Sequence, residues 1–108
     1  MSALSDNQNW IIEVGDQIIQ KRAAAASPSL SLKERLLLCL WVADYCMCNA
    51  GDLSQSNILY EHWKQEAAQL AQQLSLAQTF AFFSLDEETL ALQYFERFEH
   101  ICNEIRSA

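Results

Sequence analysis

The stretch from Leu32 to Cys48 constrains the fold of this chain more than any other part of its sequence. It reads LKERLLLCLWVADYCMC, and after its first turn apolar residues occupy nearly every face that a helix would present. A surface helix carries one apolar stripe, whereas a helix that is apolar all round has to be covered on all sides. The rest of the chain, or a second copy of it, is therefore expected to surround a central helix at about residues 32–49.

Two local signals define the ends of this predicted helix. Ser31 precedes it and Glu34 follows three residues later, so each side chain can accept the backbone N–H of the other residue. At the other end, Asn49 lies two residues before Gly51, whose missing Cβ suits the left-handed conformation that often follows a helix. We expect the helix to begin after Ser31 and to end before Gly51, with Asn49, Gly51 and Asp52 as structural residues of the turn.

Apolar residues elsewhere in the chain recur every three or four positions, which predicts further helices. The sequence has only two glycines and one proline, as expected of long helices with few connections. The predicted helices run from about Asp6 to Ala26, from an N-cap at Asp52 to about Leu74, over a short segment at 75–84, and from a Ser-x-x-Glu start at Ser84 to about Arg106. The chain is thus expected to form one all-α domain, residues 1–108, a compact bundle of four long helices and one short helix around the central helix.

The chain carries a strong excess of negative charge. Fourteen Asp and Glu residues face seven Lys and Arg residues, which gives a net charge of −7. Phosphate groups and anionic membranes need a basic face, so we expect neither direct nucleic-acid binding nor membrane binding. No apolar stretch reaches the ~20 residues of a membrane span and no secretory signal is visible, which favours a cytoplasmic protein. The charge permits a basic protein partner, although acidity also serves solubility alone.

The residues that could carry chemistry show no catalytic pattern. The four cysteines Cys39, Cys46, Cys48 and Cys102 are expected to be free thiols that fill space in the core. The sequence has neither a glycine-rich phosphate loop nor a His-Glu-x-x-His motif, and its two histidines lie on different predicted helices. We therefore predict no catalytic residue, no metal site and no cofactor, and a protein that is not an enzyme.

Asp44 is the only acidic residue between Leu36 and Cys48. An unpartnered carboxylate is costly to bury, so Asp44 is expected to accept a hydrogen bond from a Trp, Tyr or Arg of another helix, or from the turn around Asn49. The alternative is a functional acid that opens into a cleft or an interface, where it would still need a partner group to form a site.

The last predicted helix concentrates acidic residues, because residues 84–108 contain six acids against two arginines. Its core stripe is Leu90, Tyr94, Phe98, Ile101 and Ile105, flanked by Phe95 and Cys102. Acids in the first turn suit the helix dipole, and a solvated face is the common outcome for such charge runs. The same face is the best candidate docking site for a basic protein, with Asp86, Glu87, Glu88, Glu96, Glu99 and Glu104 as the predicted partner-binding residues.

A series of residues within Leu32–Leu53 has a recognisable order: Glu34-Arg35-Leu36, an apolar run with Trp41, then Asp44, then the turn Asn49-Ala50-Gly51. This series resembles the signature helix of a bacterial family of DNA-mimic proteins. That family is all-helical, acidic, often dimeric and mostly uncharacterised. The resemblance implies a protein that binds a DNA-binding regulator by imitating the charge of DNA. The chain departs from the family at Ala50, where the turn has a glycine, and at Asp52-Leu53, where an aromatic residue is expected.

Three functions of different classes remain open. The first is an acidic interaction module that binds and neutralises a basic toxin, nuclease or DNA-binding protein by covering its cationic site. The second is a homodimeric accessory protein without an inhibitory role. The third is a small-ligand binder or enzyme that uses the aromatic residues and Asp44, which would require a pocket with convergent polar groups. We rank them in this order.

Overall fold

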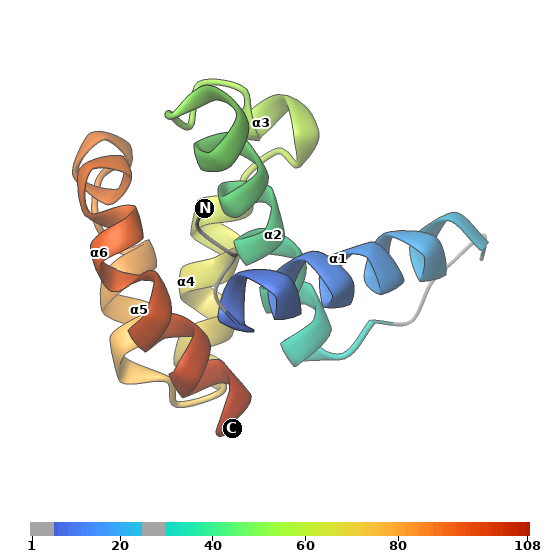
Figure 1. Ribbon diagram of the computed structural model, residues 1–108. Coiled ribbons are helices and arrows are strands. Elements are labelled where there is room, and N and C mark those ends of the chain that lie inside the picture. The colour runs from blue at the N-terminus through green and yellow to red at the C-terminus, as the bar shows by residue number, and fades with distance from the viewer. Residues whose placement is uncertain (1–5, 25–29) are drawn as a thin grey trace.

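The computed structural model describes residues 6–24 and 30–108, and the described chain folds into helices without any strand (Figure 1). Its elements are α1 (Asp6–Ala24), α2 (Leu32–Ala50), α3 (Ser56–Leu59), α4 (Trp63–Gln73), α5 (Ala77–Phe83) and α6 (Glu87–Arg106). The predicted all-α class is confirmed, with one more helix in these ranges than the sequence predicted. The expected continuation of the first helix to Ala26 lies outside the described residues.

Helix α2 lies at the centre of the fold, as its apolar surface requires. It contacts α1, α3, α4 and α6, and ten of its 19 residues are buried. Both predicted ends are confirmed. The Ser31 hydroxyl accepts the Glu34 N–H at 3.1 Å, the Glu34 carboxylate accepts the Ser31 N–H at 2.9 Å, and Gly51 has a φ of 76°. In Figure 1, α5 and α6 pack together on one side of the molecule, while the outer end of α1 projects away on the other.

The prediction of one helix from Asp52 to about Leu74 is wrong, because the chain forms α3 and α4 with a turn between them. His62 lies in this turn with a φ of 62°. Asp52 does not cap a long helix. Its Oδ1 accepts the N–H and the hydroxyl of Ser54 at 3.0 and 2.7 Å, which closes a local Asx turn instead.

The break between α3 and α4 coincides with a set of contacts around Glu66. The Glu66 carboxylate accepts a hydrogen bond from the Tyr60 hydroxyl and forms an ion pair with Arg35 of α2 at 3.2 Å. The Arg22 guanidinium of α1 lies 5.6 Å from the centroid of the Tyr60 ring. In a continuous helix, residues six apart do not face each other. The turn at His62 lets Tyr60 reach Glu66, so these contacts account for the broken helix.

The N-cap of the last helix is Asp86 rather than the predicted Ser84, and α6 begins at Glu87. The Asp86 carboxylate accepts the Thr89 N–H at 2.8 Å and acts as the N-cap of α6. Ser84 instead donates its hydroxyl to the Phe80 carbonyl at 2.7 Å, at the end of α5. Helix α5 confirms the short helix predicted at 75–84. Both Ser and Asp are good N-caps. Here Asp86, which lies closer to the helix than Ser84, accepts the free N–H of Thr89.

Gly15 marks the closest approach of α1 to α2. A Cβ atom built at Gly15 would lie 2.1 Å from Cδ1, 2.5 Å from Cγ and 2.9 Å from Cβ of Trp41. These atoms include the root of the Trp41 side chain, which cannot swing away without a change of rotamer or a shift of the helix. The glycine is therefore the residue that lets α1 pack against the indole.

We expect Gly15→Ala to destabilise the protein. The overpacking should cost about 2–3 kcal/mol, the upper part of the usual range, because the added Cβ would overlap the root of the indole. The better helix propensity of alanine should return about 1 kcal/mol. The net loss in the free energy of unfolding should be about 1–2 kcal/mol in a urea titration. Gln17→Ala, at an exposed position of α1, is the matched control and should change stability by less than about 0.5 kcal/mol. Equal stability of the two variants would contradict the assigned role of Gly15.

Candidate protein-binding site

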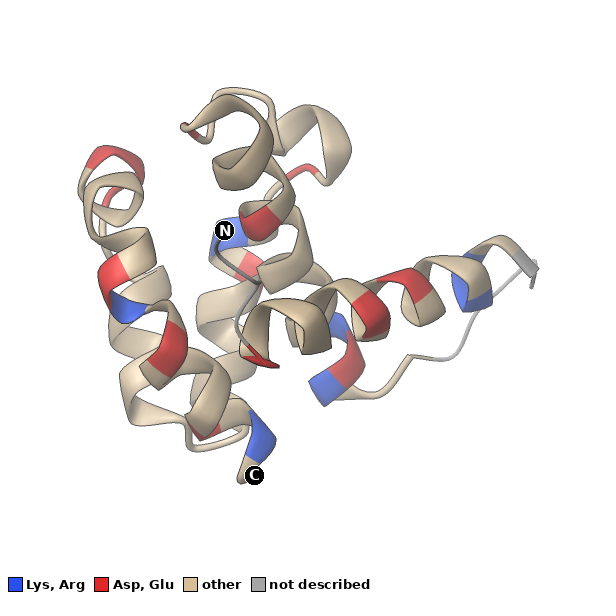
Figure 2. Ribbon diagram, viewed as in Figure 1, with Lys and Arg blue, Asp and Glu red and all other residues tan. Residues whose placement is uncertain are grey.

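Acidic residues occur on several helices of the described chain and not on α6 alone (Figure 2). Two of those predicted to bind a partner are engaged in contacts between helices. Glu104 is a structural residue. Its carboxylate accepts the Gln78 N–H at 3.1 Å, and the Thr79 N–H and hydroxyl both at 2.7 Å, at the start of α5. Burial by itself raises the pKa of Glu104, but these hydrogen bonds together lower it. Glu104 thus holds α6 against α5.

Glu99 also belongs to a contact between helices. Its Oε1 accepts a hydrogen bond from the Asn7 amide of α1 at 2.7 Å. The same amide nitrogen donates to Asn103 at 3.1 Å, and the Asn7 oxygen accepts from Arg106 at 2.8 Å. Asn7 is 5% exposed. This cluster joins the start of α1 to the end of α6, so Glu99 contributes to the fold whether or not it meets a partner.

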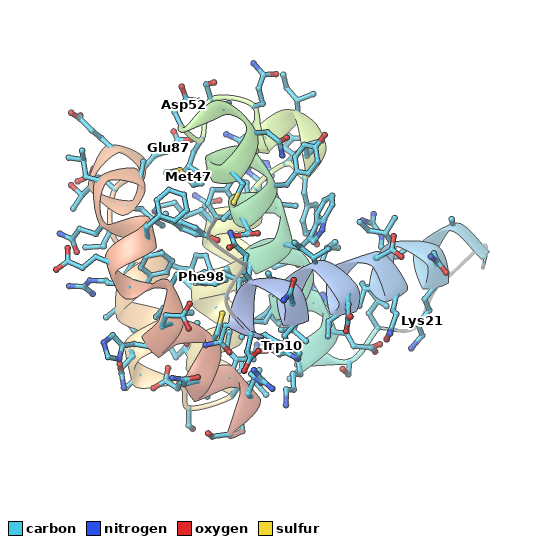
Figure 3. All side chains as sticks on the ribbon, in the orientation of Figure 1. Trp10, Lys21, Met47, Asp52, Glu87 and Phe98 are labelled. Atoms are coloured by element: carbon cyan, nitrogen blue, oxygen red, sulfur yellow. The ribbon has the colours of Figure 1, made fainter. Side chains whose placement is uncertain are left out.

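Glu87, Glu88 and Glu96 remain exposed on α6, and no ion pair between the described residues engages them. Two of them, Glu87 and Glu88, line a groove of about 480 Å³ together with the turn that follows α2. Figure 3 labels Asp52 and Glu87, which lie close together across this groove. We call it the acidic groove. It is lined by Gly51, Asp52, Leu53, Ser54, Glu87, Glu88, Ala91 and Leu92.

The acidic groove combines charge with exposed apolar surface. Leu92 is 79% exposed, and Phe95, one turn further along α6, is 57% exposed. Hydrogen bonds from Ser54 hold the pKa of Asp52 below its ordinary value, which favours the ionised carboxylate at neutral pH. A large apolar side chain in water beside three carboxylates is an arrangement that a partner can cover.

Sequence reasoning found the acids but missed the apolar part of this surface. Phe95 was expected to flank the core stripe, yet its ring is mostly in water and contacts the buried Tyr94 ring edge-on at 5.1 Å. The helical spacing of the sequence could have predicted the exposure of Leu92. Leu92 lies on the side of α6 opposite Leu90, Tyr94 and the other core residues, where a polar residue is usual.

Asp44 meets a tyrosine of another helix, one of the partners expected for it. Its Oδ1 accepts a hydrogen bond from the Tyr94 hydroxyl of α6 at 2.8 Å, and the Cys48 thiol lies 3.7 Å from the same oxygen. Asp44 is 4% exposed. Burial raises the pKa of this carboxyl, and the hydrogen bond from Tyr94 partly opposes the rise. The residue ties α2 to α6.

The four cysteines are free thiols, and Cys39, Cys46 and Cys102 are buried as expected. Cys48 is exposed, so the prediction that all four fill space in the core is wrong for this residue. Burial raises the pKa of Cys102 to about 12 and that of Cys39 still further, so neither is a thiolate at neutral pH. The described residues contain no cluster of His, Cys, Asp and Glu that could hold a metal ion. None of the helices in the described ranges is both long and apolar enough to cross a membrane.

No protein-family model, characterised protein or solved structure shows significant similarity to this chain.

We expect the stability contributed by Asp44 to depend on pH. Burial raises its folded-state pKa above the ordinary 3.8, so the folded protein binds the proton more tightly than the unfolded chain. Its contribution is therefore most favourable below pH 3.8 and is lost as the pH rises through the folded-state value. Tyr94→Phe removes the hydroxyl that donates to the Asp44 carboxylate and should cost about 1–3 kcal/mol at neutral pH and less in acid.

The measurement is urea unfolding of the wild type and Tyr94→Phe between about pH 4 and about pH 7. Asp44→Asn cannot ionise, so in this background the cost of Tyr94→Phe should no longer vary with pH. A cost that varies equally in both backgrounds would show that Asp44 is not the titrating group.

Proposed function

We propose that the protein is an interaction module whose acidic groove binds a basic partner protein. The observation that carries the proposal is the exposure of Leu92 beside Asp52, Glu87 and Glu88. Apolar contact would supply binding free energy, while the carboxylates would steer and orient the partner. The matching partner surface is an amphipathic helix that carries Lys or Arg beside Leu-like side chains.

Charge favours such a partner over the other occupants. A nucleic acid would bring phosphates to a carboxylate-lined groove, which is repulsive. A second copy of the chain that docked groove to groove would bring the same three carboxylates against each other, which is also unfavourable. A basic helix would bring positive charge to the groove, so neither repulsion arises.

The proposal extends to the role of the protein in the cell. The four free thiols favour a reducing, cytoplasmic location. The net charge of −7 and the resemblance of Leu32–Leu53 to a DNA-mimic family favour a toxin, nuclease or DNA-binding regulator as the partner. On this proposal the protein neutralises its partner by covering a cationic site, and it performs no catalysis itself.

A defined peptide tests the acidic groove. A synthetic amphipathic helical peptide of Lys and Leu should bind. In NMR spectra of the protein, the backbone amide signals that shift on binding should be those of residues 51–54 and 87–92. The double variant Glu87→Gln/Glu88→Gln should weaken binding about twofold to thirtyfold, because each of the two rim carboxylates contributes about 0.2–1 kcal/mol. Affinity should also fall as salt rises from about 0.05 M to about 0.5 M.

The matched control is Gln69→Lys/Gln73→Lys, which changes the net charge equally at exposed positions of α4. If this control weakens binding as much as the α6 variant, only the net charge matters and the groove is not the site. Light scattering at several protein concentrations tests for a homodimer. If the protein binds a second copy of itself more tightly than it binds the peptide, the proposal is rejected.

Leu92 should matter for binding and not for folding. Leu92→Ala is expected to lower peptide affinity about tenfold, since it removes most of the apolar contact, and to change stability by less than about 0.5 kcal/mol. Ile58→Ala is the control, because Ile58 is 77% exposed on α3 and does not line the groove. If the two variants bind the peptide with equal affinity, Leu92 is not part of the binding site.

A further inference from the structure

A second groove, of about 590 Å³, lies between α1 and α2. From α1 it is lined by Ile12, Glu13 and Asp16, among others, and from α2 by Trp41, Asp44 and Tyr45. It shares no lining residue with the acidic groove. We call it the aromatic groove, and the inference below does not depend on the proposed function.

Two stacked rings form the aromatic part of its wall. The Trp41 and Tyr45 rings have centroids 5.2 Å apart and an interplanar angle of 28°. Gly15 sets the position of the indole, because any larger residue there would overlap it. Tyr45 is 47% exposed. A large aromatic side chain that stays half in water, on a rigid helix, offers a ring surface to a ligand.

The charges around these rings are all negative. Glu13 and Asp16 are exposed carboxylates of α1, and Asp44 is 4% exposed at the α2 side of the groove. No Lys or Arg is among the lining residues. Asp16 accepts a hydrogen bond from Gln20 at 2.9 Å, which orients its carboxylate without neutralising it. Aromatic faces and carboxylates both attract cations.

Elsewhere in the fold, arginine side chains lie over aromatic rings. The Arg106 guanidinium lies 5.1 Å from the Trp10 ring centroid, and the Arg22 guanidinium lies 5.6 Å from the Tyr60 centroid. Within the described part of the chain, no cation lies over Trp41 or Tyr45 in the same way. The aromatic groove has the acceptor surface that these arginines use, with carboxylates added.

We infer that the aromatic groove binds the arginine side chain of a polypeptide. A guanidinium is planar, stacks on aromatic rings and remains charged at every physiological pH. Its two edges can donate to carboxylates such as Glu13 and Asp16. Ile12, which is 43% exposed, would contact the methylene stem of the bound side chain. The groove volume exceeds that of one side chain and leaves room for the neighbouring backbone.

Blocked tripeptides test this inference on the intact protein. Gly-Arg-Gly is titrated to about 10 mM while NMR follows the indole N–H signal of Trp41, assigned with Trp41→Phe. The expected result is a saturable shift of that signal. The peptide with citrulline in place of arginine has nearly the same shape without the charge, and it should bind at least about tenfold more weakly. Gly-Lys-Gly should also bind more weakly, because an ammonium does not stack.

Variants of the groove separate its two components. Tyr45→Ala should weaken binding about twofold to fivefold, and Tyr45→Phe should retain it. Glu13→Gln/Asp16→Asn should weaken binding about fivefold. Gln69→Lys/Gln73→Lys, which makes the same change in net charge on α4, should leave the affinity within about twofold.

The inference is overturned if the arginine peptide causes no saturable shift, or if the citrulline peptide binds equally well. It is overturned as a guanidinium site if the lysine peptide binds as tightly as the arginine peptide. Because the readout is the Trp41 signal and the acidic groove is read from residues 51–54 and 87–92, failure of one site is distinguishable from failure of the other.

Discussion

The burial of α2 on all sides is the constraint on which the rest of the structure depends. Exposure of apolar surface to water is unfavourable, and α2 has no polar face that it could turn to the solvent. Helices α1, α3, α4 and α6 therefore each cover part of it. The cover has to follow the shape of α2 closely. At Trp41 this requires a glycine on α1, since no side chain fits between the indole and the neighbouring helix. The choice of Gly15, unfavourable in an isolated helix, follows from the packing.

Hydrogen bonds between helices then fix how the covering helices are placed. Asp44 meets Tyr94 between α2 and α6, Glu66 meets Arg35 between α4 and α2, and Glu104 meets the start of α5. Each bond joins residues that are 25 or more positions apart in the sequence. Polar groups that are buried without a partner are costly, so these ties select one arrangement among the many that would cover α2.

The difference between local and distant interactions explains how far the sequence could be interpreted. Both ends of α2 were predictable, because Ser31, Glu34 and Gly51 act within a few residues of the helix they limit. The break before α4 was not, because its contacts include Arg35 and Arg22 on other helices. The same holds for the candidate site. Glu104 and Glu99 have the pattern of surface acids, and only their partners on α5 and α1 reveal them as structural residues.

Contacts within the chain also determine which charged side chains remain unpaired. Within the described residues, five of the seven basic side chains contact other parts of the chain: Lys21 with Glu34, Arg22 with Tyr60, Lys33 with the Ala108 carbonyl, Arg35 with Glu66, and Arg106 with Asn7 and Trp10. Acids outnumber bases by two to one, so intramolecular pairing leaves most carboxylates without a cation. Those carboxylates repel one another, which costs folding free energy unless something else lowers their repulsion. A cationic partner lowers it, and the carboxylates that line the two grooves lie where a partner would also cover Leu92 or Tyr45.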